Sequence, residues 1–140
     1  MIALVSGGFD PLHVGHIRLF DAAMTRGRLV VALNSDAWLL RKKGYVFMPW
    51  AERHEILCAL KQVALVIKFN DDDDTACDAL KKMTPHYFCN GGDRLHPNPA
   101  EDALCRKIGI KQIFDCGGGV KAQSSSELVR RACGNHAGTL

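Results

Sequence analysis

The sequence predicts an α/β fold, a doubly wound, five-stranded parallel sheet in a three-layer α/β/α sandwich. Short apolar runs rich in β-branched residues alternate along the chain with longer segments of helical period. The 47% hydrophobic and 24% charged content is that of an ordinary globular chain. With 140 residues the chain has room for one core only, so we expect a single domain over residues 1–133.

Five apolar runs are the predicted strands. They are nearly continuous in apolar residues, which is typical of strands buried on both faces of a parallel sheet. Right-handed crossovers between such strands give a Rossmann-like arrangement. The runs span residues 2–5, 29–33, 63–67, 86–89 and 111–114.

The segments between the strands carry the predicted helices, marked by apolar residues at helical spacing. Gly27 and Gly109 are predicted to end two of them, because a left-handed residue commonly follows a helix. Residues 134–140 are small and polar without periodicity, which predicts a flexible tail. The helices are expected over residues 14–24, 56–60, 77–83, 100–108 and 125–133.

Charge and cysteine content exclude several classes of protein. Eighteen basic and fifteen acidic residues give a net charge of +3, and their even spread argues against a nucleic-acid or membrane binder. The six cysteines have no metal-binding spacing and are interpreted as free thiols. The apolar run after Met1 has no basic stretch before it, unlike a signal peptide, so we expect a cytoplasmic protein.

The loop after the first strand is the strongest candidate site, because ligands of open parallel sheets bind beyond the carboxyl ends of the strands. Gly7 and Gly8 allow a close backbone approach to a ligand. His13 and His16 share one face of the first helical turn, at the positive end of the helix dipole, and Gly15 between them leaves room for a large ligand. This pattern predicts a phosphate site that needs no nucleophile. The alternative is a capped helix with two solvent-facing histidines.

Three later loops carry further polar residues. The run Asp71–Asp74 is explained by water-facing carboxylates and by Asp74 or Thr75 capping the next helix, with magnesium binding as the weaker alternative. Gly91 and Gly92 again permit close approach. Ser124 and Glu127 form a capping-box pair that predicts a helix start at Ser125. Ser125 and Ser126 would then place hydroxyls at a helix N-terminus, where a triphosphate binds readily.

The segment GGFDPLHVGH, residues 7–16, resembles the HxGH signature of the nucleotidyltransferase superfamily, in particular its cytidylyltransferase-like branch. The likeness continues to about Arg131, in the order seen in heptose-1-phosphate adenylyltransferases and glycerol-3-phosphate cytidylyltransferases. The further matching residues are Asn34–Ala37, Lys43-Gly44, Pro49, Glu52-Arg53, Asp74-Thr75 and Gly91–Asp93.

The resemblance implies transfer of a nucleotidyl group from CTP or ATP to a small phosphorylated alcohol or sugar phosphate, with release of pyrophosphate. It also implies Mg²⁺ arriving with the nucleoside triphosphate, and a homodimer. The middle of the chain is more like the heptose-phosphate adenylyltransferases. The short length is more like glycerol-3-phosphate cytidylyltransferase, which favours CTP as the donor. A non-catalytic nucleotide-binding regulator is the alternative from another class. An NAD-binding domain is excluded because the first loop lacks GxGxxG.

The resemblance assigns roles to individual residues. His13 and His16 would hold the phosphates and the reaction centre, and Ser125 with Ser126 the leaving pyrophosphate. Lys43 would bridge the two reacting phosphates, with Lys42 as the fallback because the register is uncertain by one. The remaining nucleotide-binding candidates are Gly7, Gly8, Phe9, Asp10, Gly15, Gly91, Gly92, Asp93, Arg94, Ser124 and Lys121.

Three assignments stay open at this point. Asp10, Lys42 and Arg53 are the candidate substrate-binding residues, but an exposed helix charge paired with a carboxylate would explain Arg53 equally well. The cytidylyltransferase form has an arginine five residues before the first serine, where this chain has Gly119, so Lys121 is the nearest cation. A group of apolar residues could be core or dimer contact: Trp38, Leu39, Val46, Phe47 and Trp50.

Overall fold

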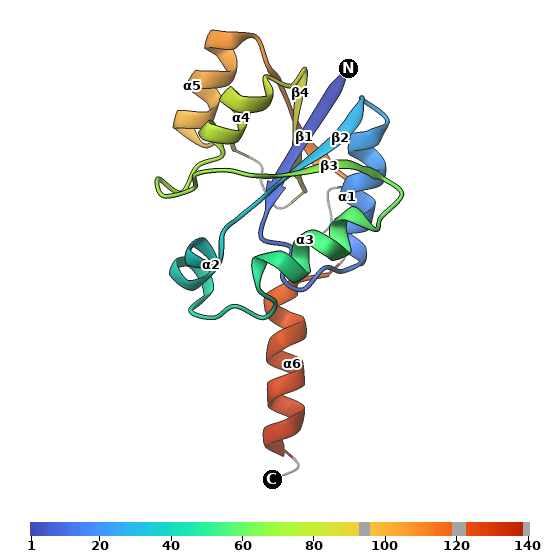
Figure 1. The fold of residues 1–140 in the computed structure, drawn as a ribbon. Coiled ribbons are helices and arrows are strands. Elements are labelled where there is room, and N and C mark those ends of the chain that lie inside the picture. Colours follow the sequence, from blue (N-terminus) through green and yellow to red (C-terminus); the bar gives the residue numbers. More distant parts are fainter. Residues whose placement is uncertain (93–95, 119–122, 139–140) are drawn as a thin grey trace.

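The structure is a computed structural model that describes residues 1–92, 96–118 and 123–138. Its centre is a five-stranded parallel sheet in the order β3-β2-β1-β4-β5 (Figure 1). All five predicted strands are present, and several run further than the apolar pattern predicted. The strands are β1 Ile2–Gly7, β2 Arg28–Leu33, β3 Val63–Lys68, β4 Tyr87–Gly91 and β5 Lys111–Cys116.

Two apolar cores lie on opposite faces of the sheet, as the predicted three-layer sandwich requires. Along β1, Ala3 and Val5 belong to one core and Leu4 to the other, because successive strand side chains point to opposite faces. The first core includes Phe20 of α1 (Val14–Met24) and Leu57 of α3 (Trp50–Cys58). The second packs against α4 (Cys77–Met83) and α5 (Pro99–Ile108).

One helix was not predicted from the sequence. No helix was predicted between residues 24 and 56, but Asp36–Lys43 form the helix α2. The Ser35 side chain caps its start by accepting from the Trp38 N–H at 3.0 Å. Gly44 ends it in the left-handed conformation at φ 81°. The caps were readable in the sequence, but only Leu39 of this helix is buried, so no apolar stripe marked it.

The boundaries of α3 and α6 differ from the prediction, whereas α1 ends at Met24 as expected but without Gly27 as its cap. α3 begins at Trp50, ahead of the expected 56. α1 ends at Met24 with a right-handed cap at Thr25; at Gly27, a Cβ would lie 2.7 Å from the Met1 carbonyl oxygen, so this glycine serves close packing. α6, Ser125–Gly138, continues past the predicted end at Cys133 and extends away from the body of the molecule (Figure 1).

The topology fixes where a ligand site can form. β1, β2 and β3 follow one another toward one edge of the sheet, whereas β4 and β5 lie on the other side of β1. The order therefore reverses between β1 and β4, and open α/β sheets bind ligands at such a reversal. No helix among the described residues is long and apolar enough to cross a membrane.

Candidate active site

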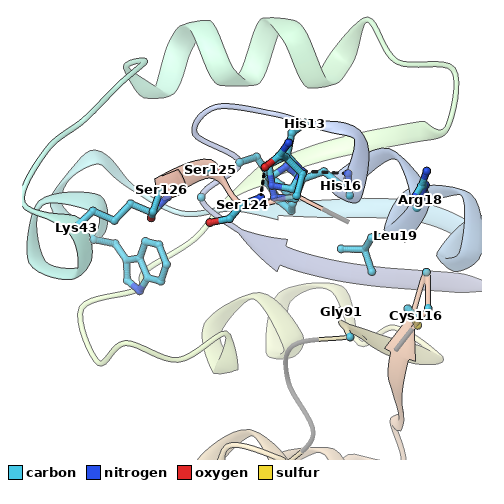
Figure 2. Close-up of a pocket in the computed structure, with 18 residues that line it drawn as sticks. His13, His16, Arg18, Leu19, Lys43, Gly91, Cys116, Ser124, Ser125 and Ser126 are labelled. Carbon is cyan, nitrogen blue, oxygen red and sulfur yellow. Dashed lines mark hydrogen bonds between the residues drawn. The ribbon is translucent and has the colours of Figure 1, made fainter. Parts of the chain in front are cut away.

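A cavity of about 320 Å³ opens at the carboxyl ends of β1, β4 and β5, at this reversal (Figure 2). Its wall includes the start of α1 with His13 and His16, and the start of α6 with Ser124, Ser125 and Ser126. At one end lies Lys43 of α2; Figure 2 shows Arg18, Gly91 and Cys116 toward the other. The topology thus brings together three of the predicted loops, the first loop, Gly91–Gly92 and Ser124–Ser126, whereas the Asp71–Asp74 run does not line the cavity.

The two histidines are fixed against each other. His13 is the N-cap of α1, and its Nδ1 accepts from the Gly15 N–H at 3.0 Å. The His13 N–H in turn donates to Nδ1 of His16 at 3.2 Å. The rings stack with centroids 3.8 Å apart, and the edge of Phe9 packs on His16 at 4.8 Å.

This geometry determines the tautomer of both rings. Each Nδ1 accepts a backbone N–H, so the proton of each neutral ring lies on Nε2. Both rings can therefore donate from Nε2 to a phosphate oxygen at a helix N-terminus. Gly15 lines the cavity, and a Cβ there would lie 2.9 Å from Cε1 of His13, so the missing side chain also makes room for the His13 ring.

The serines lie at the second helix N-terminus of the cavity. The Ser124 hydroxyl accepts from the Glu127 N–H at 3.3 Å, which confirms the cap and the helix start at Ser125. Glu127 pairs with Arg130 and Arg131 in the helix. The Ser125 hydroxyl is buried and donates to the Pro11 carbonyl at 2.7 Å, so it joins α6 to the first loop. Ser126 also lines the cavity.

The structure distinguishes the two candidate lysines. Lys43 lines the cavity, and its Nζ lies 3.4 Å from the Asp10 carbonyl oxygen. Lys42 points elsewhere, since its Nζ is 3.7 Å from a carboxylate oxygen of Asp74. Arg41 holds the same carboxylate at 3.0 Å. The three consecutive basic residues Arg41, Lys42 and Lys43 therefore have different roles, because Lys43 lines the cavity and the other two secure α2.

Asp10 and Arg53, the candidate substrate-binding residues, make their contacts within the protein and do not line the cavity. Asp10 is fully buried, and its carboxylate accepts the N–H groups of Phe47 and Met48, both at 2.7 Å. Arg53 is only 1% exposed, so the exposed alternative was wrong. Its guanidinium donates to Asp36 and to carbonyl oxygens that include Gly8. Both side chains hold the loops around the cavity without lining it.

The end of the cavity opposite α2 is built from glycine. Gly91 and Gly92 end β4, and Gly117 and Gly118 follow β5. A Cβ at Gly92 would collide with the Gly118 carbonyl oxygen, so the two loops meet backbone to backbone. Backbone without side chains at these glycines lets a planar group approach closely. Arg18, Leu19 and Cys116 line the same end of the cavity beside the glycines.

Three of the four aspartates, Asp72, Asp73 and Asp74, are exposed to water as expected, whereas Asp71 is buried. Asp71 is 2% exposed and accepts from Asn34 and Ser35, which anchors the start of α2. Asp73 accepts from Thr75 in a local turn. The N-cap residue of α4 is Ala76, which has no side-chain bond, but the Thr75 hydroxyl accepts from the Cys77 N–H at 3.2 Å, at the start of the helix. Within the described ranges, no group of three or more His, Cys, Asp or Glu side chains is placed to hold a metal ion.

Some expected residues lie outside the described ones, and some cavity residues were missed. Asp93, Arg94, Gly119 and Lys121 fall in the undescribed segments. The glycines after β5 could have been found, because they directly follow a predicted strand. α1 and α2 contribute residues for which the sequence carried no signal. The missed residues are Arg18, Leu19, Trp38, Cys116, Gly117, Gly118 and Gln123.

A family model described as cytidylyltransferase-like matches residues 4–115 of the chain. Among curated proteins, the Bifunctional protein HldE of Bradyrhizobium diazoefficiens is 41% identical over 145 residues, and that of Nitrobacter hamburgensis 33% over 137. Each alignment covers 95% of this chain and 27% of the relative. The chain therefore spans about a quarter of the length of these relatives.

The fold also matches solved structures. A crystal structure of a lipopolysaccharide core biosynthesis protein from Thermoplasma volcanium superimposes with a TM-score of 0.68 at 23% sequence identity. The match covers 82% of this chain and 93% of that one. At this identity the likeness concerns the fold alone, and it confirms the predicted α/β architecture.

Proposed function

Because the chain belongs to the cytidylyltransferase-like family, we propose that it is a nucleotidyltransferase acting on a small phosphorylated alcohol or sugar phosphate. The donor is CTP or ATP, and pyrophosphate leaves. One observation carries the proposal: the N-termini of α1 and α6, a fixed histidine pair and the ammonium group of Lys43 all meet at one cavity.

The chemistry proposed for this cavity needs positioning and charge neutralisation. An oxygen of the acceptor phosphate attacks the α-phosphorus of the nucleotide, and the bond from that phosphorus to the bridging oxygen of pyrophosphate breaks. Nε2–H groups of His13 and His16 would donate to the phosphoryl oxygens as their charge rises. Lys43 would lie between the two reacting phosphates. The N-terminus of α6 with Ser126 would hold the departing pyrophosphate.

Mg²⁺ enters this scheme with the nucleotide. The described residues offer no cluster of metal ligands, and Mg²⁺ commonly binds through substrate phosphates with few protein ligands. The ion would neutralise charge on the triphosphate oxygens. The protein's own contribution is the set of donors around those oxygens.

The test is pyrophosphate release by the purified protein with Mg²⁺ and either CTP or ATP, across a panel of phosphorylated alcohols and sugars. Isothermal titration with each nucleotide identifies the base. We expect His16→Ala to lower the rate by about 10²–10³-fold, as when a transition-state donor is removed. His54→Ala is the matched control, because His54 lies on α3 outside the cavity and its loss should leave the rate unchanged.

Tight nucleotide binding without pyrophosphate release across the whole panel would contradict the enzyme and favour the regulatory alternative. Retained turnover in His16→Ala, with an unchanged unfolding temperature, would contradict the role of the histidine pair. Pyrophosphate release by wild type and by His54→Ala, with loss of release in His16→Ala, would support both the enzymatic function and the role of the histidine pair.

We also propose a homodimer. Of the apolar residues that could have been core or contact, Leu39 is fully buried and Trp50 packs on the core. Phe47 remains 54% exposed, as does the neighbouring Leu40 of α2, so apolar surface is available for a partner subunit. Light scattering of wild type and Phe47→Glu tests this: a monomeric wild type would contradict it.

A further inference from the structure

The two tryptophans of the chain have different environments. The indole N–H of Trp50 donates to the Leu33 carbonyl at 3.2 Å, and its ring packs against the core. Trp38 is half-buried and lines the cavity. Among the described residues, no side-chain nitrogen that lacks a hydrogen-bond partner is buried, so the indole N–H of Trp38 is open to solvent and can donate to a ligand. Trp50 is therefore a packing residue, whereas Trp38 presents a ring and a donor to the cavity.

The position of Trp38 is fixed by its neighbours. Its backbone N–H donates to the Ser35 hydroxyl in the cap of α2. A Cβ at Gly8 would lie 3.3 Å from Cζ3 of the indole and 2.7 Å from Cδ2 of Leu39. The bare backbone of Gly8 thus lets α2 lie close over the first loop. The indole is held at the cavity wall before any ligand arrives.

Trp38 and Lys43 come from the same helix and line the same cavity. If Lys43 contacts the acceptor phosphate, the body of the acceptor extends from that phosphate along the wall that α2 provides. The glycine surface at the other end suits the planar base. An indole face is flat and apolar, and it matches the C–H face of a sugar ring, while its N–H can donate to a hydroxyl.

We propose that Trp38 is a specificity-determining residue that selects a cyclic sugar phosphate as acceptor over a short linear phosphorylated alcohol. The C–H face of the sugar ring lies on the indole, and a ring hydroxyl accepts from its Nε1–H. A glycerol-sized acceptor is too small to cover the indole. This inference rests on the proposed function, since it concerns the acceptor of that same reaction.

A binding experiment tests the proposal without turnover. In Trp50→Phe, Trp38 is the only tryptophan, so fluorescence reports on it alone. We expect hexose and heptose 1-phosphates, added with a non-hydrolysable nucleotide analogue, to change the emission in a saturable way. Glycerol 3-phosphate and inorganic phosphate should leave it unchanged. A response to the nucleotide alone, an equal response to glycerol 3-phosphate, or no response to any compound overturns the proposal.

Kinetics separate this inference from the proposed function. Trp38→Ala should raise KM for the cyclic sugar phosphate about tenfold, a typical loss when a pocket contact is removed, with kcat and nucleotide affinity nearly unchanged. Trp38→Phe keeps an aromatic face without the N–H, so its KM for the cyclic sugar phosphate should lie between the values of wild type and Trp38→Ala. Pyrophosphate release that is equal in wild type and Trp38→Ala overturns the inference while leaving the proposed function intact. If no acceptor supports release, the proposed function fails, and the fluorescence result still decides the ligand of Trp38.

Discussion

The two ends of the cavity are built by different means. At the α2 end, side chains form the wall, with the ammonium of Lys43 and the ring of Trp38. At the β4 and β5 end, the wall is largely the glycine backbone of residues 91–92 and 117–118. Removing a side chain should therefore weaken binding at the first end, whereas adding one should block it at the second.

The largest expected effect is at the α2 end. Lys43→Ala should lower kcat/KM for the acceptor by about 10²–10³-fold, because a charge beside the transferred phosphoryl group is lost. Lys42→Ala is the matched control. Its ammonium is about half exposed and faces Asp74, and such a surface pair contributes at most about 1 kcal/mol to stability. Steady-state kinetics of both variants show which lysine acts in the cavity. An equal loss of kcat/KM in the two variants would contradict the orientation of α2.

A smaller effect is expected at the glycine end. Gly92→Ala must push the β4 loop away from the Gly118 carbonyl, and overpacking of this kind costs about 1–3 kcal/mol. We expect roughly a tenfold or greater loss of nucleotide affinity by calorimetry. Acceptor selectivity should be unchanged, since the α2 wall is untouched.

The control for this variant is Gly109→Ala. Gly109 ends α5 in the left-handed region, at φ 82°, and its Cβ would meet nothing within 4 Å. The Gly109→Ala variant should lose about 1–2 kcal/mol of stability and no nucleotide affinity. An equal loss of affinity in both variants would show that general destabilisation, rather than the close Gly92–Gly118 approach, explains the effect.

The same contrast explains what the sequence could predict. The strands were found because parallel strands buried on both faces are nearly continuous in apolar residues. The histidines and Gly91–Gly92 were found because each lies at or just after a strand end. These are local signals in the sequence. The sheet topology then brings the residues that carry them to one edge of the sheet.

The roles of α2, Asp10 and Arg53 were not predictable in the same way. Leu39 is the only residue of α2 in the core, so its periodicity gave no signal. The Arg53 guanidinium bonds to Gly8, Asn34 and Met48 carbonyls and to Asp36. Those partners come from segments far apart in the sequence, and only the tertiary structure shows that a charged side chain is buried among them.

The smallest expected effect concerns what holds the α2 end in place. Asp71 anchors the residues before α2, and its own carbonyl accepts from Arg41 at 2.8 Å. Burial acts to raise the pKa of this carboxyl, but hydrogen bonds from Ser35 and Asn34 and the charge of Arg41 outweigh it and lower the pKa below 3.8. The folded state therefore favours the ionised carboxylate.

The sign of the pH dependence follows from this shift. A carboxyl whose pKa is lower in the folded state stabilises the protein above its unfolded pKa, and that contribution is lost as pH falls below it. Urea unfolding should show wild type losing stability as pH drops through 3.8 toward the folded pKa.

Asp71→Asn isolates this contribution. The variant should be roughly 1–3 kcal/mol less stable at neutral pH, because the Ser35 and Asn34 donors lose a charged acceptor. Its stability should also fall less on acidification than that of wild type. Acceptor KM should rise while nucleotide affinity is kept, because Asp71 supports α2 and has no contact with the glycine surface. A variant that loses nucleotide affinity to the same extent would show that the two ends are not independently supported.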